Sequence, residues 1–280
     1  MDKYVLANIP EFEEKLAQRN IVNSVPHLIP VLDQLPDKFI LLDVGCGPGS
    51  ITCDIAKRHP SATILGIDAS PEAVEKARQY AKDIGVTNTL FTVGDGLDIA
   101  AVATQPGFEA VLGGCDVVNT HQVHIHVQDA QKLMRELYAA AKPQGGVVCC
   151  REGHMGMLGH WPASQGMAEI FVAIAKLMQA RGQDPFVATK LFSHALAAGF
   201  KLENITTGMG SWVYATPKER REWVDLTIGS MKHVFMSNKQ AASMLSVDIS
   251  QVVEEAEAWV QAEDGWFGVP CPQVICRRQD

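Results

Sequence analysis

The chain has 280 residues, of which 47% are apolar, and a formal net charge of −8. This length and composition allow one large domain or two small ones with a well-filled core. The acidic balance and the absence of a Lys/Arg-rich patch argue against a nucleic-acid substrate and against a polybasic membrane contact. No apolar run approaches the length that spans a bilayer.

The seven cysteines show no C-x-x-C pair and no spacing with histidine that is typical of zinc. We therefore expect free, buried thiols in a reducing compartment. The first 20 residues are charged and lack the apolar segment of a signal peptide, so the sequence predicts a cytoplasmic protein.

Residues 1–36 precede the first strand and are predicted to form a helical lid in two pieces, with Pro26 and Pro30 breaking the second. Residues 37–153 alternate between strand and helix patterns and form the predicted cofactor-binding core. The expected elements are strands 39–44, 63–68, 89–93 and 146–151, and helices 50–59, 71–85 and 130–142.

A glycine turn follows the first strand of this core. Ile40 to Val44 is almost wholly apolar, as expected for a strand buried on both faces of a parallel sheet. Gly45, Gly47 and Gly49 then allow a sharp turn and a close approach of the backbone to a ligand. The pattern is G-x-G-x-G rather than the G-x-G-x-x-G of dinucleotide-binding turns.

Two aspartates close the next two strands. Asp68 lies 23 positions after Gly45, where a carboxylate accepts hydrogen bonds from both ribose hydroxyls of a nucleoside. Asp95 would lie at the neighbouring strand tip, within reach of an adenine amino group. Two carboxylates without clustered cations suit S-adenosylmethionine, whose sulfonium and ammonium groups are cationic, better than a pyrophosphate.

The fourth strand is ambiguous, because 108–112 and 116–119 both look extended and a Gly-Gly pair lies between them. The loop after it, residues 119–126, should lie outside the carboxyl ends of the strands, where ligands bind in open α/β sheets. Cofactor and substrate are therefore expected to meet at this loop.

Residues 154–280 are expected to complete the same domain rather than to form a second one. Two largely helical insertions, 154–196 and 217–263, should build a substrate chamber above the carboxyl edge of the sheet. Strands are expected at 201–215 and 269–276.

Several of these motifs together resemble class I S-adenosylmethionine-dependent methyltransferases, and specifically the ubiquinone/menaquinone-type branch that acts on small molecules. The matching segments are 19–24, 43–49, 66–71, 94–95, 120–123, 142–146, 198–200 and 265–267. The resemblance implies a Rossmann-like α/β fold with a seven-stranded, mostly parallel sheet, the seventh strand lying antiparallel beside the fifth. It also implies S-adenosyl-L-methionine as cofactor and S-adenosylhomocysteine as product.

The resemblance assigns a set of cofactor-binding positions. They are Tyr4, Arg19, Asp43, Gly45, Gly47, Asp68, Ala69, Asp95, Gly96, Asn119 and Thr120. Arg19 could clamp the carboxylate of the methionine moiety or be a solvated helix charge. Tyr4 could belong to the lid or be an ordinary surface aromatic residue.

The acceptor side is less well defined by the sequence. His121 occupies the position of a family histidine and is the candidate for positioning the acceptor or acting as a base, although it could equally be structural. His124, Trp161, Trp212 and Phe267 are the candidate substrate-binding residues. Arg151 and Glu152 are expected to form an ion pair. No metal site is expected, because no acidic or cysteine ligand accompanies the loop histidines at proper spacing.

The chain most resembles fungal natural-product methyltransferases, including thiol S-methyltransferases such as the gliotoxin bis-thiomethyltransferase. The resemblance implies S-methylation of the reduced dithiol of an epidithiodiketopiperazine in secondary metabolism. O- or C-methylation of a quinone or phenolic metabolite stays open. So do an NAD-dependent oxidoreductase and a catalytically silent protein that binds S-adenosylmethionine. A monomer is expected, with a small-molecule substrate and no membrane partner.

Overall fold

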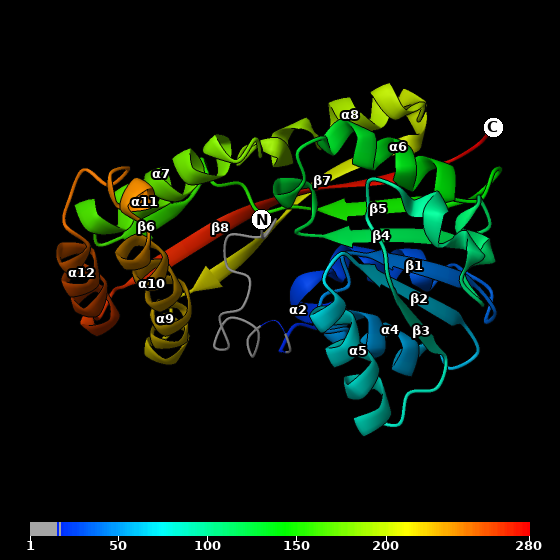
Figure 1. Ribbon diagram of the computed structural model, residues 1–280, viewed down its shortest axis with the longest axis horizontal. Helices are drawn as coiled ribbons and strands as arrows, with labels where there is room; N and C mark the ends of the chain where they lie inside the picture. The colour runs from blue at the N-terminus through cyan, green and yellow to red at the C-terminus, as the bar shows by residue number, and fades with distance from the viewer. Residues whose placement is uncertain (1–15, 17) are drawn as a thin grey trace.

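A computed structural model describes residue 16 and residues 18–280 of the chain, so the Tyr4 prediction lies outside the described residues. In this part of the chain one mixed sheet has the strand order β3-β2-β1-β4-β5-β8-β6, and β7 pairs with β8 (Figure 1). The strands are β1 Ile40–Val44, β2 Thr63–Asp68, β3 Thr89–Val93, β4 Val117–His121, β5 Val147–Arg151, β6 Gly159–Trp161, β7 Ile205–Tyr214 and β8 Trp266–Arg277.

The first five strands are parallel to one another, as the sequence predicts. Asp43 of β1 lies between Gly66 of β2 and Asn119 of β4. The carboxyl ends of these strands therefore meet at one edge, where the glycine turn and the loop after β4 also begin.

The last strand, β8, runs antiparallel beside β5, which confirms the predicted position of the final strand. Its outer neighbour β7 is antiparallel to it over ten residue pairs. β6, which the sequence did not predict, adds an eighth strand to the seven expected, because three residues of the first insertion pair with the start of β8.

Two predicted strand segments are wrong in part. Residues 108–112 are not extended; Glu109–Val111 is a short 3-10 helix, η3, and the fourth strand starts at Val117. The segment before β7 also turns, because Leu202–Asn204 is another 3-10 helix, η6. Segments of three residues are too short for periodicity to distinguish a 3-10 turn from a strand.

Helices cover both faces of the sheet. One face packs against α6, α8 and the 3-10 helix η2, and the other packs against α3 and α4, with α5 beyond β2 and β3. Their bounds, with those of the short elements beside them, are α2 Ile21–Ser24, η1 Pro26–Leu28, α3 Ile29–Leu32, α4 Ser50–Arg58, α5 Pro71–Asp83, η2 Ile99–Thr104, η4 His124–His126, α6 Ala130–Ala140, η5 Val187–Lys190 and α8 Leu191–Ala198.

The two insertions form a second apolar core around the first half of β8, beyond the carboxyl edge of the parallel strands (Figure 1). Its helical elements are α7 Gln165–Ala180, α9 Pro217–Trp223, the π-helix η7 Val224–Ile228, α10 Gly229–Ser237, α11 Lys239–Ala242 and α12 Ile249–Gln261. Within the described residues, none of the helices is long and apolar enough to cross a membrane.

Candidate active site

The glycine turn after β1 is held against β2. The backbone N–H groups of Gly45 and Cys46 both donate to the carbonyl of Ile67, at 2.8 and 3.0 Å. Gly45 has a positive φ of 75°, and a Cβ there would collide with the side chain of Val123. Gly47, with φ 55°, instead faces open space, because a Cβ there would meet no heavy atom within 4 Å. The turn thus leaves room for a ligand at Gly47.

The Asp68 carboxylate lies beside this open space. One carboxylate oxygen accepts the N–H of Gly47 at 2.9 Å and the other accepts the N–H of Ser70 at 2.9 Å, on the far side of Ala69. Burial raises the pKa of the Asp68 carboxyl, and these backbone hydrogen bonds oppose that effect. A carboxylate in this position can also accept hydrogen bonds from ribose hydroxyls, and that role of Asp68 stays a prediction.

Asp43 lies behind the turn and is fully satisfied. It accepts hydrogen bonds from the Thr52 hydroxyl at 2.6 Å and from the Asn119 amide at 2.9 Å. Burial raises the pKa of Asp43 to about 6, while those two hydrogen bonds lower it and the Asp68 charge adds to the rise. The Asn119 oxygen Oδ1 is buried without a hydrogen-bond partner, so this side chain keeps one acceptor available for a ligand.

The remaining cofactor candidates lie at the same edge. Asp95 follows β3 and accepts the N–H of Leu97 at 2.9 Å, which folds the chain back over the strand tip. Gly96 is tightly packed, since a Cβ there would lie 3.1 Å from the side chains of Val44 and Leu133. Thr120 is buried in β4, one residue before the tip. These positions and the open space at Gly47 lie at one edge of the sheet, and their role toward a nucleoside stays a prediction.

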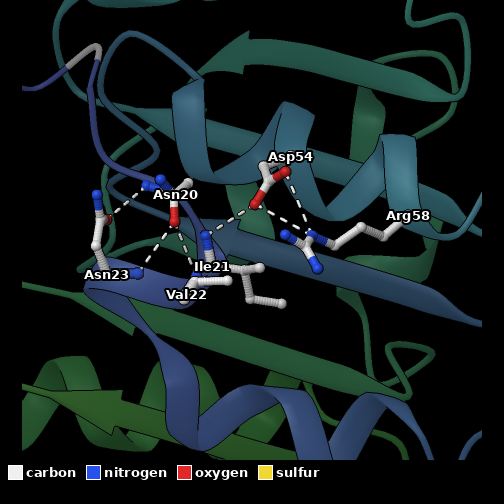
Figure 2. A network of polar contacts seen from close by, with 6 residues as sticks. All are labelled: Asn20, Ile21, Val22, Asn23, Asp54 and Arg58. Carbon is white, nitrogen blue, oxygen red and sulfur yellow. Dashed lines mark hydrogen bonds and ion pairs between the residues drawn. The ribbon is translucent and has the colours of Figure 1, made fainter.

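The segment that carries Arg19 is anchored by a helix cap (Figure 2). Asn20 accepts the N–H groups of Val22 and Asn23 at 2.9 and 3.0 Å, and Asn23 accepts the N–H of Asn20 at 2.8 Å. The N–H of Ile21 donates to Asp54 of α4 at 2.9 Å. Helix capping therefore explains Asn20 and Asn23 of the matching segment 19–24. The sequence prediction missed this cap, although two polar residues spaced three apart are a helix-start signal.

Arg19 lies against an aromatic ring rather than in open solvent. Its guanidinium is 5.5 Å from the centre of the Trp212 ring, a distance typical of a cation–π contact. Trp212 is itself fixed, because its indole N–H donates to the carbonyl of Asn23 at 3.0 Å. The predicted role of Arg19 toward a carboxylate stays a prediction.

His121 lies at the tip of β4, with its ring edge toward the same Trp212 at 5.5 Å between ring centres. Burial lowers its pKa well below the usual range, and the Arg19 and Arg151 guanidiniums lower it further. The imidazole is therefore neutral at physiological pH. Both ring nitrogens are buried and lack a hydrogen-bond partner.

The predicted ion pair between Arg151 and Glu152 is wrong: within the described residues, the two side chains form no ion pair with each other. Arg151 donates to the carbonyl of Ser24 at 3.0 Å, whereas Glu152 accepts the backbone N–H groups of Val123 and His124 at 2.8 and 3.0 Å. Adjacent residues in extended backbone point to opposite sides, which is the physical reason for the difference.

Glu152 organises the loop after β4, a role that sequence reasoning missed. Besides Val123 and His124, its carboxylate also accepts the N–H of Ile125 at 3.4 Å, so it caps the 3-10 helix η4. His124 is buried, with Nδ1 3.4 Å from the same carboxylate. An acidic residue directly after a predicted buried strand is a sequence signal that could have pointed to this role.

The three aromatic residues that the sequence predicts to bind substrate do not lie together. Phe267 is fully buried and packs against Phe171 and Trp223 inside the second core. Trp161 is 56% exposed and donates its indole N–H to Asp264 at 2.7 Å. It pairs with Trp266, the neighbour of Phe267, and so lies on the opposite face of the strands. Of the three, only Trp212 contacts His121.

Among the described residues there is no group of three His, Cys, Asp or Glu side chains that could hold a metal ion. The His126 pKa is lowered to about 4, mainly by burial. The charged and titratable side chains described at this edge include carboxylates, imidazoles and the guanidiniums of Arg19 and Arg151.

Comparison with known proteins identifies relatives of the chain. Residues 36–190 match a methyltransferase domain family. The chain is 28% identical over 249 residues to an uncharacterized methyltransferase of Schizosaccharomyces pombe, which covers 86% of this chain and 84% of that protein. It is 32% identical over 118 residues to norajmaline N-methyltransferase of Rauvolfia serpentina, covering 42% of this chain but only 37% of that enzyme.

Solved structures share the fold at low sequence identity. Phosphoethanolamine N-methyltransferase 2 of Haemonchus contortus, bound to S-adenosylhomocysteine, has a TM-score of 0.59 and 16% identity, covering all of this chain and 58% of that one. The YcgJ protein of Bacillus subtilis has a TM-score of 0.55 and 14% identity, covering 91% of this chain and 97% of that one.

Proposed function

The chain belongs to the methyltransferase domain family and is an S-adenosylmethionine-dependent methyltransferase, and from this premise we propose that it methylates a sulfur atom of a small-molecule dithiol. The best candidate is the reduced dithiol of an epidithiodiketopiperazine, a gliotoxin-like secondary metabolite, which accepts one methyl group on each sulfur.

The burial of His121 close to the Arg19 and Arg151 guanidiniums is the observation that carries this proposal. A histidine whose pKa lies well below the usual range is a weak base, and it takes a proton from a hydroxyl poorly. A thiol, with a pKa of about 8.5, ionises readily without help. The Arg19 and Arg151 guanidiniums, each less than 6 Å from the Trp212 ring centre, would favour the thiolate. The site therefore suits an acceptor that is itself acidic.

S-adenosylmethionine supplies the electrophilic methyl group and the leaving group when it is bound. We propose that Asp68 holds the ribose and Asp95 the adenine, with the backbone of Gly45 and Gly47 against the nucleoside. Arg19 would hold the methionine carboxylate. The task of the chain is then to orient the acceptor sulfur in line with the methyl group and to exclude water.

A phenol or quinol is the second candidate acceptor, favoured by the Trp212 ring beside His121. A flat phenolate could stack on this indole and would also gain from the two guanidiniums. Its pKa of about 10 is higher than that of a thiol, so it would depend more strongly on His121.

The test is transfer of a labelled methyl group to a panel of acceptors. Purified protein is incubated with labelled S-adenosylmethionine and a reduced epidithiodiketopiperazine, a phenol or a quinol. We expect S-methyl products from the dithiol, formed twice per molecule. O-methyl or C-methyl products alone would contradict the proposal. Calorimetry with S-adenosylhomocysteine and NAD in parallel tests the oxidoreductase alternative, which requires NAD to bind.

The variant His121→Ala separates acceptor chemistry from cofactor binding. We expect unchanged affinity for S-adenosylhomocysteine and turnover lowered by roughly tenfold or more. If the variant instead loses cofactor affinity, His121 belongs to the cofactor site.

We also propose that the protein works as a cytoplasmic monomer. The seven cysteines are buried free thiols, which is typical of a reducing compartment. Size-exclusion chromatography with light scattering tests the monomer, and fractionation of cells that express the chain tests its location.

A further inference from the structure

Five side chains gather at the tips of β4 and β5, next to the glycine turn but on the other side of β1. We call them the acceptor cluster: Arg19, His27, His121, Arg151 and Trp212. They come from the segment before α2, from η1, from both strand tips and from β7. Trp212 and Arg19 are its half-buried members, so a ligand that approaches from solvent meets them first.

Arg151 is the centre of charge in this cluster. Its side chain is 1% exposed, and its guanidinium donates to the carbonyls of Ser24 and Ser211 at 3.0 and 3.5 Å. Within the described residues no carboxylate lies within ion-pair distance of it. Burying a charge without a counter-charge is costly, so such a group normally has a partner of opposite sign.

Several buried nitrogen atoms around the Arg151 guanidinium also lack hydrogen-bond partners. Arg151 Nε and both ring nitrogens of His27 and His121 are buried and have no hydrogen-bond partner. Each neutral imidazole offers one N–H donor, and the guanidinium Nε offers another. Native proteins leave few buried polar atoms unsatisfied, so this concentration in one place marks a binding site for a group that accepts hydrogen bonds.

We propose that the acceptor cluster is a subsite for an anionic group of the methyl acceptor, and that Arg151 determines specificity for acidic acceptors. The anion is a carboxylate of the acceptor, carried on the same molecule as the atom that receives the methyl group. This inference rests on the proposed function, because it concerns the acceptor of the same reaction. The adenosine half of the cofactor is expected at β1, β2 and β3, away from Arg151.

The experiment compares matched acids and neutral amides. Dihydrolipoate and dihydrolipoamide share one dithiol, and 4-hydroxybenzoate and 4-hydroxybenzamide share one phenol; in each pair only the first carries a carboxylate. Each compound is titrated calorimetrically into the complex of the protein with S-adenosylhomocysteine. We expect each acid to bind roughly 10- to 100-fold more tightly than its amide, as a charge-assisted hydrogen bond predicts.

Arg151→Gln should remove this preference and bring each acid to the affinity of its amide. Arg151→Lys keeps the charge but loses the planar fork, so we expect an intermediate preference. This second variant keeps the test usable if Arg151→Gln does not fold. Equal binding of acids and amides to the unaltered protein would overturn the proposal.

Arg220 offers a matched control from the second core. It is also 1% exposed, with Nε and Nη1 buried and unpartnered, and it lies 5.8 Å from the Trp259 ring centre. Arg220→Gln removes the same buried charge away from the acceptor cluster, so the preference for acids should persist. If both variants lose the preference equally, Arg151 acts only through overall packing and the proposal fails.

The methionine carboxylate of the cofactor is the other source of an anion. S-adenosylhomocysteine and methylthioadenosine, which lacks the amino acid group, are therefore titrated into the same variants. If Arg151→Gln weakens only S-adenosylhomocysteine and leaves the acid preference intact, the subsite belongs to the cofactor and the assignment to the acceptor is wrong. Unchanged cofactor affinity supports it.

The two proposals fail in different ways. If acids are preferred through Arg151 but no dithiol in the panel is methylated, S-methylation is wrong and the anionic subsite stands. If a dithiol is methylated and Arg151→Gln leaves the ratio of kcat/KM for dihydrolipoate and dihydrolipoamide unchanged, the subsite is wrong and S-methylation stands.

Discussion

The carboxylates proposed to lie at the cofactor and the imidazoles proposed to lie at the acceptor differ in whether they have hydrogen-bond partners within the protein. Asp43 and Asp68 each accept two hydrogen bonds from neighbouring residues. Across β4, the imidazoles of His27 and His121 accept and donate none. The carboxylates are thus held by the chain itself, whereas each neutral imidazole has an N–H donor with no hydrogen-bond partner among the described residues. We propose that the first arrangement suits a cofactor that is the same for every reaction, and that the second suits a particular acceptor.

Loss of Glu152 should lower stability the most, because its carboxylate holds the loop after β4, which lies between the proposed cofactor and acceptor residues. Glu152→Ala would leave the buried N–H groups of Val123, His124 and Ile125 without their acceptor. We expect a loss of roughly 3–5 kcal/mol in unfolding free energy, measured by urea denaturation. The loop should also become more exposed to hydrogen exchange.

Glu255 is the matched control for this prediction. It also accepts three hydrogen bonds, from Ser164 Oγ at 2.6 Å, Gly166 N–H at 2.8 Å and Gln251 at 2.7 Å, but part of the group is exposed to water. Glu255→Ala should cost only about 1 kcal/mol. Equal losses for the two variants would show that burial of the Glu152 carboxylate is not what matters.

Removing the carboxylate at the end of β2 tests the cofactor side directly. Asp68→Ala should weaken binding of S-adenosylhomocysteine by roughly 1.5–3 kcal/mol, the value of a charge-assisted hydrogen bond. Calorimetry gives the dissociation constant. Asp37→Ala, an exposed aspartate in the turn before β1, should leave it unchanged. An unaltered constant for the Asp68 variant would contradict the ribose assignment.

The dependence of stability on pH reports the burial of Asp43. Its pKa is raised to about 6 in the folded protein, so folding favours the protonated form. The stabilisation is present below the unfolded pKa of about 4 and is lost as pH rises through about 6. His27, His121 and His126, whose pKa values are lowered, act in the opposite direction, because acid destabilises the fold through them.

The variant Asp43→Asn isolates this contribution. Relative to the unaltered protein, its unfolding free energy should rise by roughly 1–3 kcal/mol between pH 4 and pH 8. Urea denaturation at intervals across this range measures the difference. A difference that does not vary with pH would show that Asp43 is ionised in both states.

Substitution of two glycines distinguishes the cost of a strained backbone from the loss of space for a ligand. We expect these substitutions to have the smallest effects on stability. Gly47 and Gly85 have φ values of 55° and 70°, and a Cβ at either would meet nothing within 4 Å. Gly47→Ala and Gly85→Ala should therefore each cost about 1–2 kcal/mol of stability. Only Gly47→Ala should weaken S-adenosylhomocysteine binding. If both variants bind it normally, the open space at Gly47 is not the nucleoside site.

The sequence predicted β1, β2 and β5 well, because each is a short, mostly apolar segment bounded by turn residues. It could not predict β6, whose three residues become a strand only by pairing with Trp266 to Gly268, about 100 positions later. Short extended segments depend on such long-range partners more than on local propensity.

The sequence predicted which strands carry the candidate carboxylates, but it could not predict which face of a strand the candidate aromatic side chains meet; the binding roles of these residues stay predictions. Asp43 and Asp68 follow from the position of their strands. Trp161 and Phe267 required knowledge of which face of β8 each side chain meets, and a shift of one residue reverses that face. Arg151 and Glu152 show the same alternation, which a strand assignment alone could have used.

The contact between Val123 and the bare backbone of Gly45 has a consequence for protein engineering. Glu152 holds the backbone of Val123, and the Val123 side chain fills the place that a Cβ at Gly45 would occupy. Substitution of Glu152, directly after β5, to admit a new acceptor would therefore also disturb the glycine turn at Gly45. Libraries that vary residues 123 and 152 together should therefore yield more active clones than libraries that vary only one of these residues.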